Sequence, residues 1–461
     1  MTVTNKHHSF FLFLIPALGS LAIYIAIAYF LQREDSYLLI IGYILLFLAY
    51  LSFVFNATTN LHVYWLVNLS IIFRFSFLLA IPNLSDDFYR FIWDGRLILN
   101  EVHPFSFVPH YLISLKANLA GITEELYAQL NSPHYFTIYP PVCQAIFTIA
   151  AVISPNSMEG AVISMRVFII AAEIGSLIMI IKTLKLLGKS IKKVIFYALN
   201  PLVILELTGN LHFEAIMIFF LITSFYFFHK GNLIASAGFF SLAVCTKLIP
   251  LIFLPLIIKR VGIKKAIAYF ALVGALCYLM FLPFLSPDFL KGFSSSFLYY
   301  FSRFEFNASI YYLIREAGKL FFDVNVIVVA GAFLALAVMV LIFIYAKKEK
   351  IDDHNIFESC MWVLLIFLML TTTLHPWYII PLLSLSIFTK YRFSILWTFF
   401  IFLTYLNYTS VGYHENLLVV FFEYLFVITF LVFEIKYYRE FQVFKQSIRK
   451  KFIQSVASLK D

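Results

Sequence analysis

Long apolar stretches, separated by short polar connections, run along nearly the whole chain. Most are close to the ~20 residues that a helix needs to cross the ~30 Å hydrocarbon core of a bilayer. The predicted spans are 10–31, 37–55, 61–82, 162–182, 194–208, 214–229, 233–247, 248–258, 265–285, 325–346, 356–374, 376–389, 393–411 and 417–437. We therefore expect about 13–14 transmembrane helices, with 248–258 and 376–389 short enough to be half-spans. Two longer polar stretches, 83–135 and 286–324, interrupt the series and are expected to be outer loops.

The composition supports a membrane protein. Of the 461 residues, 62% are hydrophobic and 13% are charged, and the mean hydropathy is +0.90, whereas soluble domains carry about 25% charged residues. The sequence thus predicts a single all-α polytopic membrane domain spanning residues 1–461, with membrane lipid as a partner. The four cysteines are scattered, and no Cys/His spacing predicts a metal site.

Charge predicts the orientation. The net charge of +9 comes from basic residues in short loops and the tail, so we expect no nucleic-acid partner. The loop 182–193 has five lysines and no acid, 259–265 is also basic, and so is the tail 438–461. The stretch 83–135 has six acidic residues against three basic ones. By the positive-inside rule, 83–135 should lie outside and both termini should be cytoplasmic.

The segment 136–155 is the one apolar run that conflicts with this orientation. If it crossed the membrane, every later loop would change sides and the five-lysine loop would lie outside. Pro140 and Pro141 also suit the start of a helix better than its interior. We therefore expect 136–155 to be an interfacial or re-entrant helix.

The richest polar motif follows the third span, at 85–109. Ser85 is a good helix N-cap, which would place Asp86 and Asp87 in the first turn, where the helix dipole favours carboxylates. Arg90 and Asp94 follow Asp87 by three and seven residues, so the three share a helix face; Asp86, Arg90 and Asp94 also fall close together. The pattern predicts an amphipathic helix at the outer membrane surface, with its carboxylates facing solvent. Ordinary helix capping and interfacial anchoring are the alternative.

Other polar residues are expected on the same outer face. They are Asn210, His212 and Glu214 in one connection, His375 and Trp377 in another, Lys247 at a helix end, and Arg303 and Arg315 in the second outer loop. Each has a plain alternative as a solvated turn, an interfacial anchor or a snorkelling side chain. Within the spans, Arg166 and Glu173 share a helix face and form either an ion pair or a substrate contact.

These stretches resemble the GT-C superfamily of polytopic glycosyltransferases, most closely its bacterial mannosyltransferase-type members. The stretches that carry the resemblance are DDFYRFIWDGRLILNEVHPF (86–105), YPP (139–141), NPLVILELTGNLHFEA (200–215), TKLIPLIFLPL (246–256) and HPWY (375–378). Three predicted spans precede the aspartate motif here, where many members have one.

The resemblance implies a hexose transfer, most plausibly of mannose, from a polyprenyl-phosphate sugar to a glycan, glycolipid or protein acceptor. In the family, an acidic residue in the first outer loop acts as the catalytic base or binds the acceptor near it; Asp86 and Asp87 occupy that position here, with Asp87 slightly favoured. Cations would stabilise the leaving phosphate, and the candidates are Lys247, Arg303 and His375. The resemblance also implies direct displacement with inversion, no obligatory metal or cofactor, and a site on the extracytoplasmic face of a bacterial inner membrane. The expected substrate-binding residues are Arg90, Asp94, Arg96, His103, Tyr139, Asn210, His212, Glu214, Lys247, Arg303, His375 and Trp377.

Two other classes of protein compete with this interpretation. A lipid-linked or small-solute transporter or flippase would place charges along a path through the membrane and commonly shows internal repeats. The chain has no convincing repeat, and its polar motifs gather on one face. A non-catalytic scaffold would not need these motifs to converge.

Overall fold

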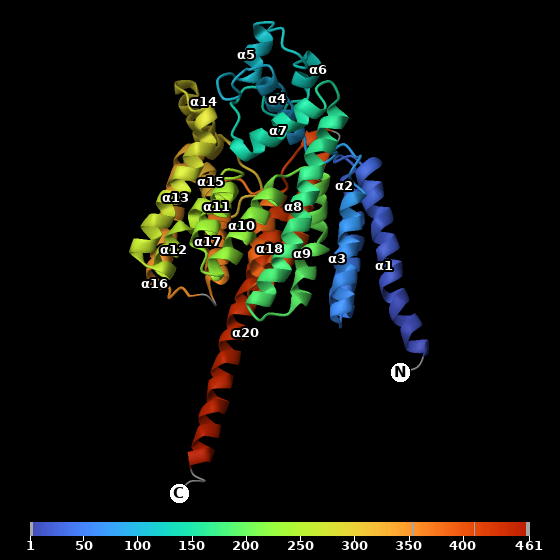
Figure 1. Ribbon diagram of the computed structural model, residues 1–461, viewed down its shortest axis with the longest axis vertical. Helices are drawn as coiled ribbons and strands as arrows, with labels where there is room; N and C mark the ends of the chain where they lie inside the picture. Colours follow the sequence, from blue (N-terminus) through green and yellow to red (C-terminus); the bar gives the residue numbers. More distant parts are fainter. Residues whose placement is uncertain (1–2, 353–354, 410, 458–461) are drawn as a thin grey trace.

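Nearly all regular structure in the protein is helical. The computed structural model describes residues 3–352, 355–409 and 411–457 (Figure 1). Among these residues the only β-strands are β1 (Tyr408–Thr409) and β2 (Gly412–Tyr413), which pair antiparallel. A bundle of long helices carries a cap of short helices at one end, and α20 extends from the other end (Figure 1). The expectation of an all-α polytopic membrane protein is confirmed.

Three helices precede the cap: α1 (Val3–Tyr29), α2 (Ser36–Asn56) and α3 (Asn60–Phe75). The third predicted span, 61–82, is too long, because α3 ends at Phe75. The carbonyl oxygens of Leu78 and Ala80 accept hydrogen bonds from the guanidinium of Arg166 instead of from later helix amides. A side chain from another helix therefore takes the backbone acceptors that would have continued α3.

The cap consists of α4 (Asp87–Leu99), α5 (Pro109–Ser114), α6 (Glu124–Ala128) and α7 (Pro141–Ile153), drawn at the top of Figure 1. The prediction that α4 lies on the surface with its carboxylates in solvent is wrong for most of the helix, since Trp93 and Asp94 are fully buried. The helix α7 packs against α4. Their backbones approach most closely at Gly95, where an added Cβ would overlap the carbonyl oxygen of Phe147.

The helix α7 covers most of the ambiguous segment 136–155. It has 13 residues, so at 1.5 Å per residue it is about 20 Å long, shorter than the ~30 Å hydrocarbon core. It begins at Pro141, and Figure 1 shows it in the cap, at the opposite end of the bundle from the start of α1 and the end of α20. That this segment is interfacial or re-entrant stays a prediction.

The centre of the bundle contains a broken helix, formed by η2 and α10. The elements of this central part are α8 (Met158–Leu186), η1 (Ile191–Val194), α9 (Ile195–Ala198), the π-helix η2 (Val203–Gly209), α10 (Glu214–His229) and α11 (Leu233–Val244). The axes of η2 and α10 differ by 111°. Leu211, in the break, has a φ of 62°, a left-handed conformation that leucine rarely adopts. Arg166 holds the break by donating to the carbonyls of Thr208 at 2.9 Å and Gly209 at 3.0 Å.

The second half of the chain completes the bundle. Its elements are η3 (Ile249–Phe253), α12 (Leu254–Val261), α13 (Ile263–Phe281), η4 (Leu282–Phe284), α14 (Pro287–Arg303), α15 (Ile310–Phe322), α16 (Ile327–Lys348), α17 (Ile356–Leu370), η5 (Pro376–Tyr378), α18 (Ile379–Ser386), α19 (Phe393–Phe400), η6 (Ile401–Asn407) and α20 (Leu417–Ala457). Of the predicted tail 438–461, residues 458–461 lie outside the described residues.

Fewer helices are long enough to span a bilayer than the sequence predicts. In the described part of the chain, five helices meet the length and hydropathy needed, or six if the bent pair η2 and α10 forms one span, and six shorter apolar helices accompany them. The count of about 13–14 spans therefore depends on broken and short helices, and it stays a prediction.

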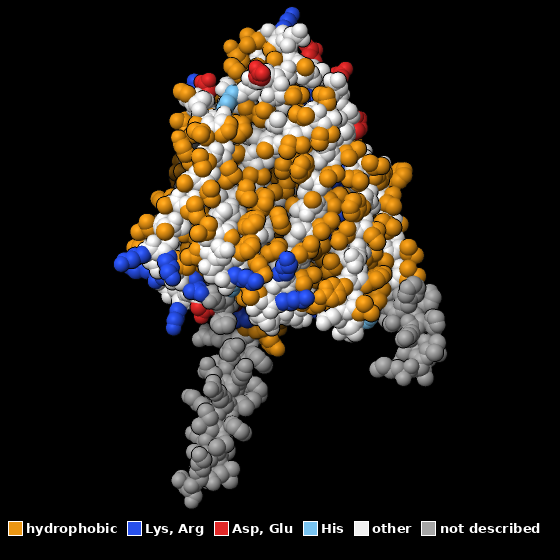
Figure 2. Space-filling model, in the orientation of Figure 1, with side chains coloured by type: hydrophobic (Ala, Val, Ile, Leu, Met, Phe, Trp, Pro, Cys, Tyr) orange, Lys and Arg blue, Asp and Glu red, His pale blue; other side chains and the backbone are white. Residues whose placement is uncertain are grey.

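Hydrophobic side chains cover the flanks of the bundle, and Lys and Arg gather at the end from which α20 extends (Figure 2). The basic loops 182–193 and 259–265 lie at this end, opposite the cap (Figure 1). This distribution has the form expected from the positive-inside rule. Which membrane surface each end faces stays a prediction.

Charged groups inside the bundle are paired across helices. The side chain of Glu173 accepts hydrogen bonds from Arg74 at 3.0 and 2.8 Å and from the Tyr197 hydroxyl at 2.6 Å, and both charged groups are fully buried. The expectation that Glu173 and Arg166 face each other or a substrate is therefore wrong. Arg166 donates to backbone carbonyls instead, because the break in the η2–α10 pair and the early end of α3 leave those acceptors without amide partners.

Candidate functional site

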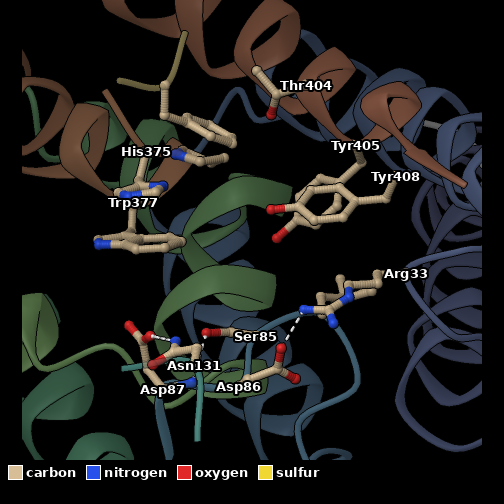
Figure 3. Close-up of a pocket in the computed structure, with 13 residues that line it drawn as sticks. Arg33, Ser85, Asp86, Asp87, Asn131, His375, Trp377, Thr404, Tyr405 and Tyr408 are labelled. Carbon is tan, nitrogen blue, oxygen red and sulfur yellow. Dashed lines mark hydrogen bonds and ion pairs between the residues drawn. The ribbon is translucent and has the colours of Figure 1, made fainter. Parts of the chain in front are cut away.

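A cavity of about 190 Å³ lies where the cap meets the bundle (Figure 3). The start of α4 forms one side of it, η5 and η6 form the opposite side, and the connection between α1 and α2 closes one edge. The lining residues are Arg33, Leu84, Ser85, Asp86, Asp87, Asn131, Phe306, His375, Pro376, Trp377, Thr404, Tyr405 and Tyr408. Four of the residues predicted from sequence, Asp86, Asp87, His375 and Trp377, thus meet in one polar cavity.

Asp86 is held in an ion pair. Its Oδ2 accepts a hydrogen bond from Arg33 Nη1 at 2.5 Å, and the guanidinium lies 5.4 Å from the centre of the Tyr408 ring. The helix begins one residue later than predicted, with Asp86 at the N-cap position and Asp87 as the first helical residue. The Oγ of Ser85 only accepts a long hydrogen bond, 3.4 Å, from the Asp87 amide. Arg33 draws the Asp86 carboxylate away from the helix amides, so no side chain caps α4 in the usual way.

Asp87 presents a carboxylate without a cationic hydrogen-bond donor. Its Oδ1 accepts a hydrogen bond from the Asn131 amide at 2.8 Å, and its Oδ2 lies 4.0 Å from His212 Nε2. The side chain is 25% exposed, and Figure 3 shows it at the cavity beside Asn131. The two adjacent aspartates therefore differ chemically, since one carboxylate is paired with a guanidinium and the other accepts from a neutral amide.

His212 lies in the break between η2 and α10, behind Asp87. It is 2% exposed, and its Nδ1 is 3.3 Å from Glu206 Oε2. Glu206 is fully buried and accepts hydrogen bonds from the Tyr405 hydroxyl at 2.8 Å and from the Asn210 amide at 3.0 Å. The residues of the NPLVILELTGNLHFEA stretch thus form a buried polar network that reaches the cavity through Asp87.

The HPWY segment lines the cavity opposite the aspartates. Trp377 stacks on His375, with ring centres 4.5 Å apart, and its other neighbour is the His212 ring, at 3.7 Å. Burial lowers the pKa of His375 to about 3, with smaller contributions from the charges of His212 and Lys247. His375 is therefore neutral at physiological pH. The expectation that it is a cation beside a phosphate is not supported, because this desolvated position disfavours the imidazolium.

Lys247 is paired beside the cavity. Its Nζ lies 3.1 Å from Glu214 Oε1 and 5.5 Å from the centre of the Tyr139 ring. Lys247 is therefore a cation paired with a carboxylate, at the end of a predicted span and next to the cavity.

The sequence of the first half of the chain matches a known family. Residues 21–262, more than half of the chain, match the family described as alpha-(1->6)-mannopyranosyltransferase, N-terminal domain. The chain belongs to this family. It is a mannosyltransferase, so the transporter and scaffold alternatives are not supported. None of the curated proteins compared with the chain matches it.

Several residues predicted to bind substrate instead support the cap of the mannosyltransferase. Arg90 pairs with Asp94 at 2.8 Å and donates to two carbonyls of the 132–135 segment, while Gln144 donates to Asp94 at 3.0 Å. Arg96 donates to the Gly121 carbonyl at 2.8 Å. Each of these buried groups is covered by another part of the cap, and none of them lines the cavity.

Other predicted residues lie outside the cavity as well. His103 Nε2 is 2.9 Å from the carbonyl of Phe284, which ties the cap to the end of η4. Arg303 is exposed at the end of α14. Arg315 pairs with Glu305 at 3.3 Å and with Glu316 at 2.8 Å. The mannosyltransferase therefore has a different cation at its cavity from those expected.

The cation that lines the cavity is Arg33. The sequence did not predict it as a site residue, nor Asn131, Tyr405 and Tyr408, which also line the cavity. Arg33 had a weak signal, because it is the one basic residue in the predicted outer connection 32–36. Tyr405 and Tyr408 had none, since both fall within the predicted span 393–411. The end of α19 and the short η6 turn this segment toward the cavity, and periodicity alone does not reveal such a turn.

Proposed function

We propose that the mannosyltransferase moves a mannosyl group from a polyprenyl-phosphate donor to an acceptor hydroxyl, with Asp87 as general base. The observation that carries the proposal is the unequal environment of the two aspartates. Asp86 would have to weaken a charge-assisted hydrogen bond to Arg33 in order to take a proton. Asp87 has a neutral amide donor in place of a guanidinium, so it is the better proton acceptor.

The proposed reaction is a direct displacement. The acceptor O–H bond breaks and its proton moves to Asp87, while the acceptor oxygen bonds to the anomeric carbon. The bond between that carbon and the phosphate oxygen breaks, and the electron pair leaves with the lipid phosphate. A β-linked donor would give an α-linkage by inversion, which agrees with the α-(1→6) product in the family description.

Arg33 is the proposed partner of the leaving phosphate, in place of Arg303 and His375. It lines the cavity, its planar guanidinium matches phosphate oxygens with paired donors, and a cation at that point stabilises the developing charge. Lys247 supplies a second cation nearby. No step in this scheme uses a metal.

The cavity position supports a lipid-linked donor. It lies at the junction between the apolar bundle and the cap, where a phosphate at a membrane surface can meet a polar acceptor. At about 190 Å³, it is smaller than the ~300 Å³ typical of the smallest drug-sized sites, which favours one sugar ring in the cavity. We place this site on the extracytoplasmic face of a bacterial inner membrane, with a glycan, glycolipid or protein as acceptor.

Transfer by purified protein in lipid vesicles tests the proposal. The protein is offered polyprenyl-phosphate mannose, glucose and pentose, and a nucleotide mannose as control. Asp87→Asn should lower kcat by about 10²–10⁴-fold, the range for loss of a general base. Asp86→Asn should retain more activity and mainly raise the KM for donor, because Arg33 loses its anchor. Transfer from the nucleotide sugar alone, or an inactive Asp86→Asn beside an active Asp87→Asn, would overturn it.

A further inference from the structure

His212 is a buried imidazole placed between two carboxylates. Its Nε2 faces Asp87 Oδ2 at 4.0 Å and its Nδ1 faces Glu206 Oε2 at 3.3 Å. Within the described residues, neither ring nitrogen has a well-aligned hydrogen bond, although the side chain is almost completely buried. An imidazole in such a position normally has both nitrogens satisfied, so its arrangement calls for a functional explanation.

The surroundings fix the ring. It stacks on Trp377, with centres 3.7 Å apart and planes at 23°, and the left-handed backbone of Leu211 precedes it. A left-handed conformation is unfavourable for leucine, and here it turns the chain between η2 and α10. The ionisable groups around the ring are Asp87 from α4, Glu206 from η2, His375 beside η5, and Lys247 after α11.

The network assigns the proton on the ring. Both neighbours of the ring are carboxylates, but Nδ1 lies 3.3 Å from Glu206 Oε2, whereas Nε2 lies 4.0 Å from Asp87 Oδ2. The nearer acceptor, Glu206, therefore favours the hydrogen of a neutral imidazole on Nδ1. The lone pair of Nε2 then points toward Asp87, the side from which a proton would arrive.

We propose that His212 is a positioning residue that takes over, through Asp87, the proton released by the acceptor hydroxyl. This inference rests on the function proposed above. The proton passes from the acceptor oxygen to Asp87 and from Asp87 to His212 Nε2, and Glu206 stabilises the resulting imidazolium. Asp87 thus remains an anion while positive charge develops at the anomeric carbon. Contacts near 4 Å in the unliganded state commonly shorten once substrate is bound.

The pH dependence of kcat separates this role from a purely structural one. The wild-type kcat should fall on the acid side once the imidazole is protonated and can no longer accept the proton. In His212→Gln the plateau should drop by about 10–100-fold, the range for loss of a group that supports a catalytic residue. The acid fall should then move to lower pH, because only a carboxylate is left to be protonated, with the donor KM nearly unchanged.

Two further variants keep the test decisive if His212→Gln folds poorly. Glu206→Gln should also lower kcat and move the acid fall downward, and the double variant should be no slower than the worse single one. In His212→Ala, added imidazole should restore both the rate and the acid fall of the wild-type profile. His110→Gln, at an exposed cap histidine bonded to Tyr127, is the matched control and should behave as wild type.

The outcomes distinguish the two proposals. If the wild-type protein transfers from no polyprenyl-phosphate sugar, the proposed function fails and no profile is obtained. If it transfers, but the His212→Gln profile keeps the acid fall of the wild type and imidazole has no effect on His212→Ala, the proton-accepting role of His212 is refuted.

Discussion

Replacing Gly95 by alanine tests whether the contact between α4 and α7 sets the position of the aspartates. An ideal Cβ at residue 95 would lie 2.6 Å from the carbonyl carbon of Phe147, whereas ordinary contact begins at 3.4 Å. The obstructing atoms are backbone and cannot rotate away, and the carbonyl oxygen is nearer still, so the helices must separate by at least about 0.8 Å. Overpacking of this kind costs about 1–3 kcal/mol.

The expected effect on catalysis follows from the same displacement. Asp87 is the first residue of α4, so a shift of the helix moves its carboxylate by a similar distance. A misplacement of about 1 Å can cost about 100-fold in rate. We therefore expect Gly95→Ala to lower both the melting temperature, followed by tryptophan fluorescence, and the kcat for mannosyl transfer.

Gly274→Ala is the matched control. Gly274 lies in α13, where nothing is within 4 Å of the added Cβ, so alanine should be neutral or stabilise by about 0.5–1 kcal/mol through its helix propensity. If Gly95→Ala had the melting temperature of Gly274→Ala and wild-type kcat, the close packing at Gly95 would not position the site.

Two predictions concern ionisable groups. Glu173→Gln leaves the buried guanidinium of Arg74 without its carboxylate, so we expect the free energy of unfolding to fall by about 3–5 kcal/mol. The control is Glu159→Gln, at an exposed residue at the start of the same helix, which should lower it by at most about 1 kcal/mol. The pKa of His375 is lowered to about 3, so the stability that its neutral form contributes is present above about pH 6.5 and is lost as the pH falls toward 3. The melting temperature of His375→Gln should therefore fall less than that of wild type between pH 7 and 5; parallel curves would contradict this.

The sequence by itself determined the class of the molecule and the motifs of its site. Hydrophobic lengths and charge bias follow from the cost of placing polar groups in hydrocarbon, a cost that acts locally. Helix periodicity is also local, and it correctly placed Arg90 beside Asp94. These two residues are four apart and form an ion pair at 2.8 Å. It could not tell whether that helix face meets solvent or protein, because the answer depends on α7.

Only the tertiary structure decided which of the matching residues meet and in which chemical state. Arg33 distinguishes Asp86 from Asp87 although it lies 53 residues from Asp86, and Tyr405 orients Glu206 from 199 residues away. Such partners are chosen by how helices pack, and the same packing excludes the water that would otherwise satisfy each buried charge. The function of a residue such as His212 therefore depends on contacts that no local pattern records.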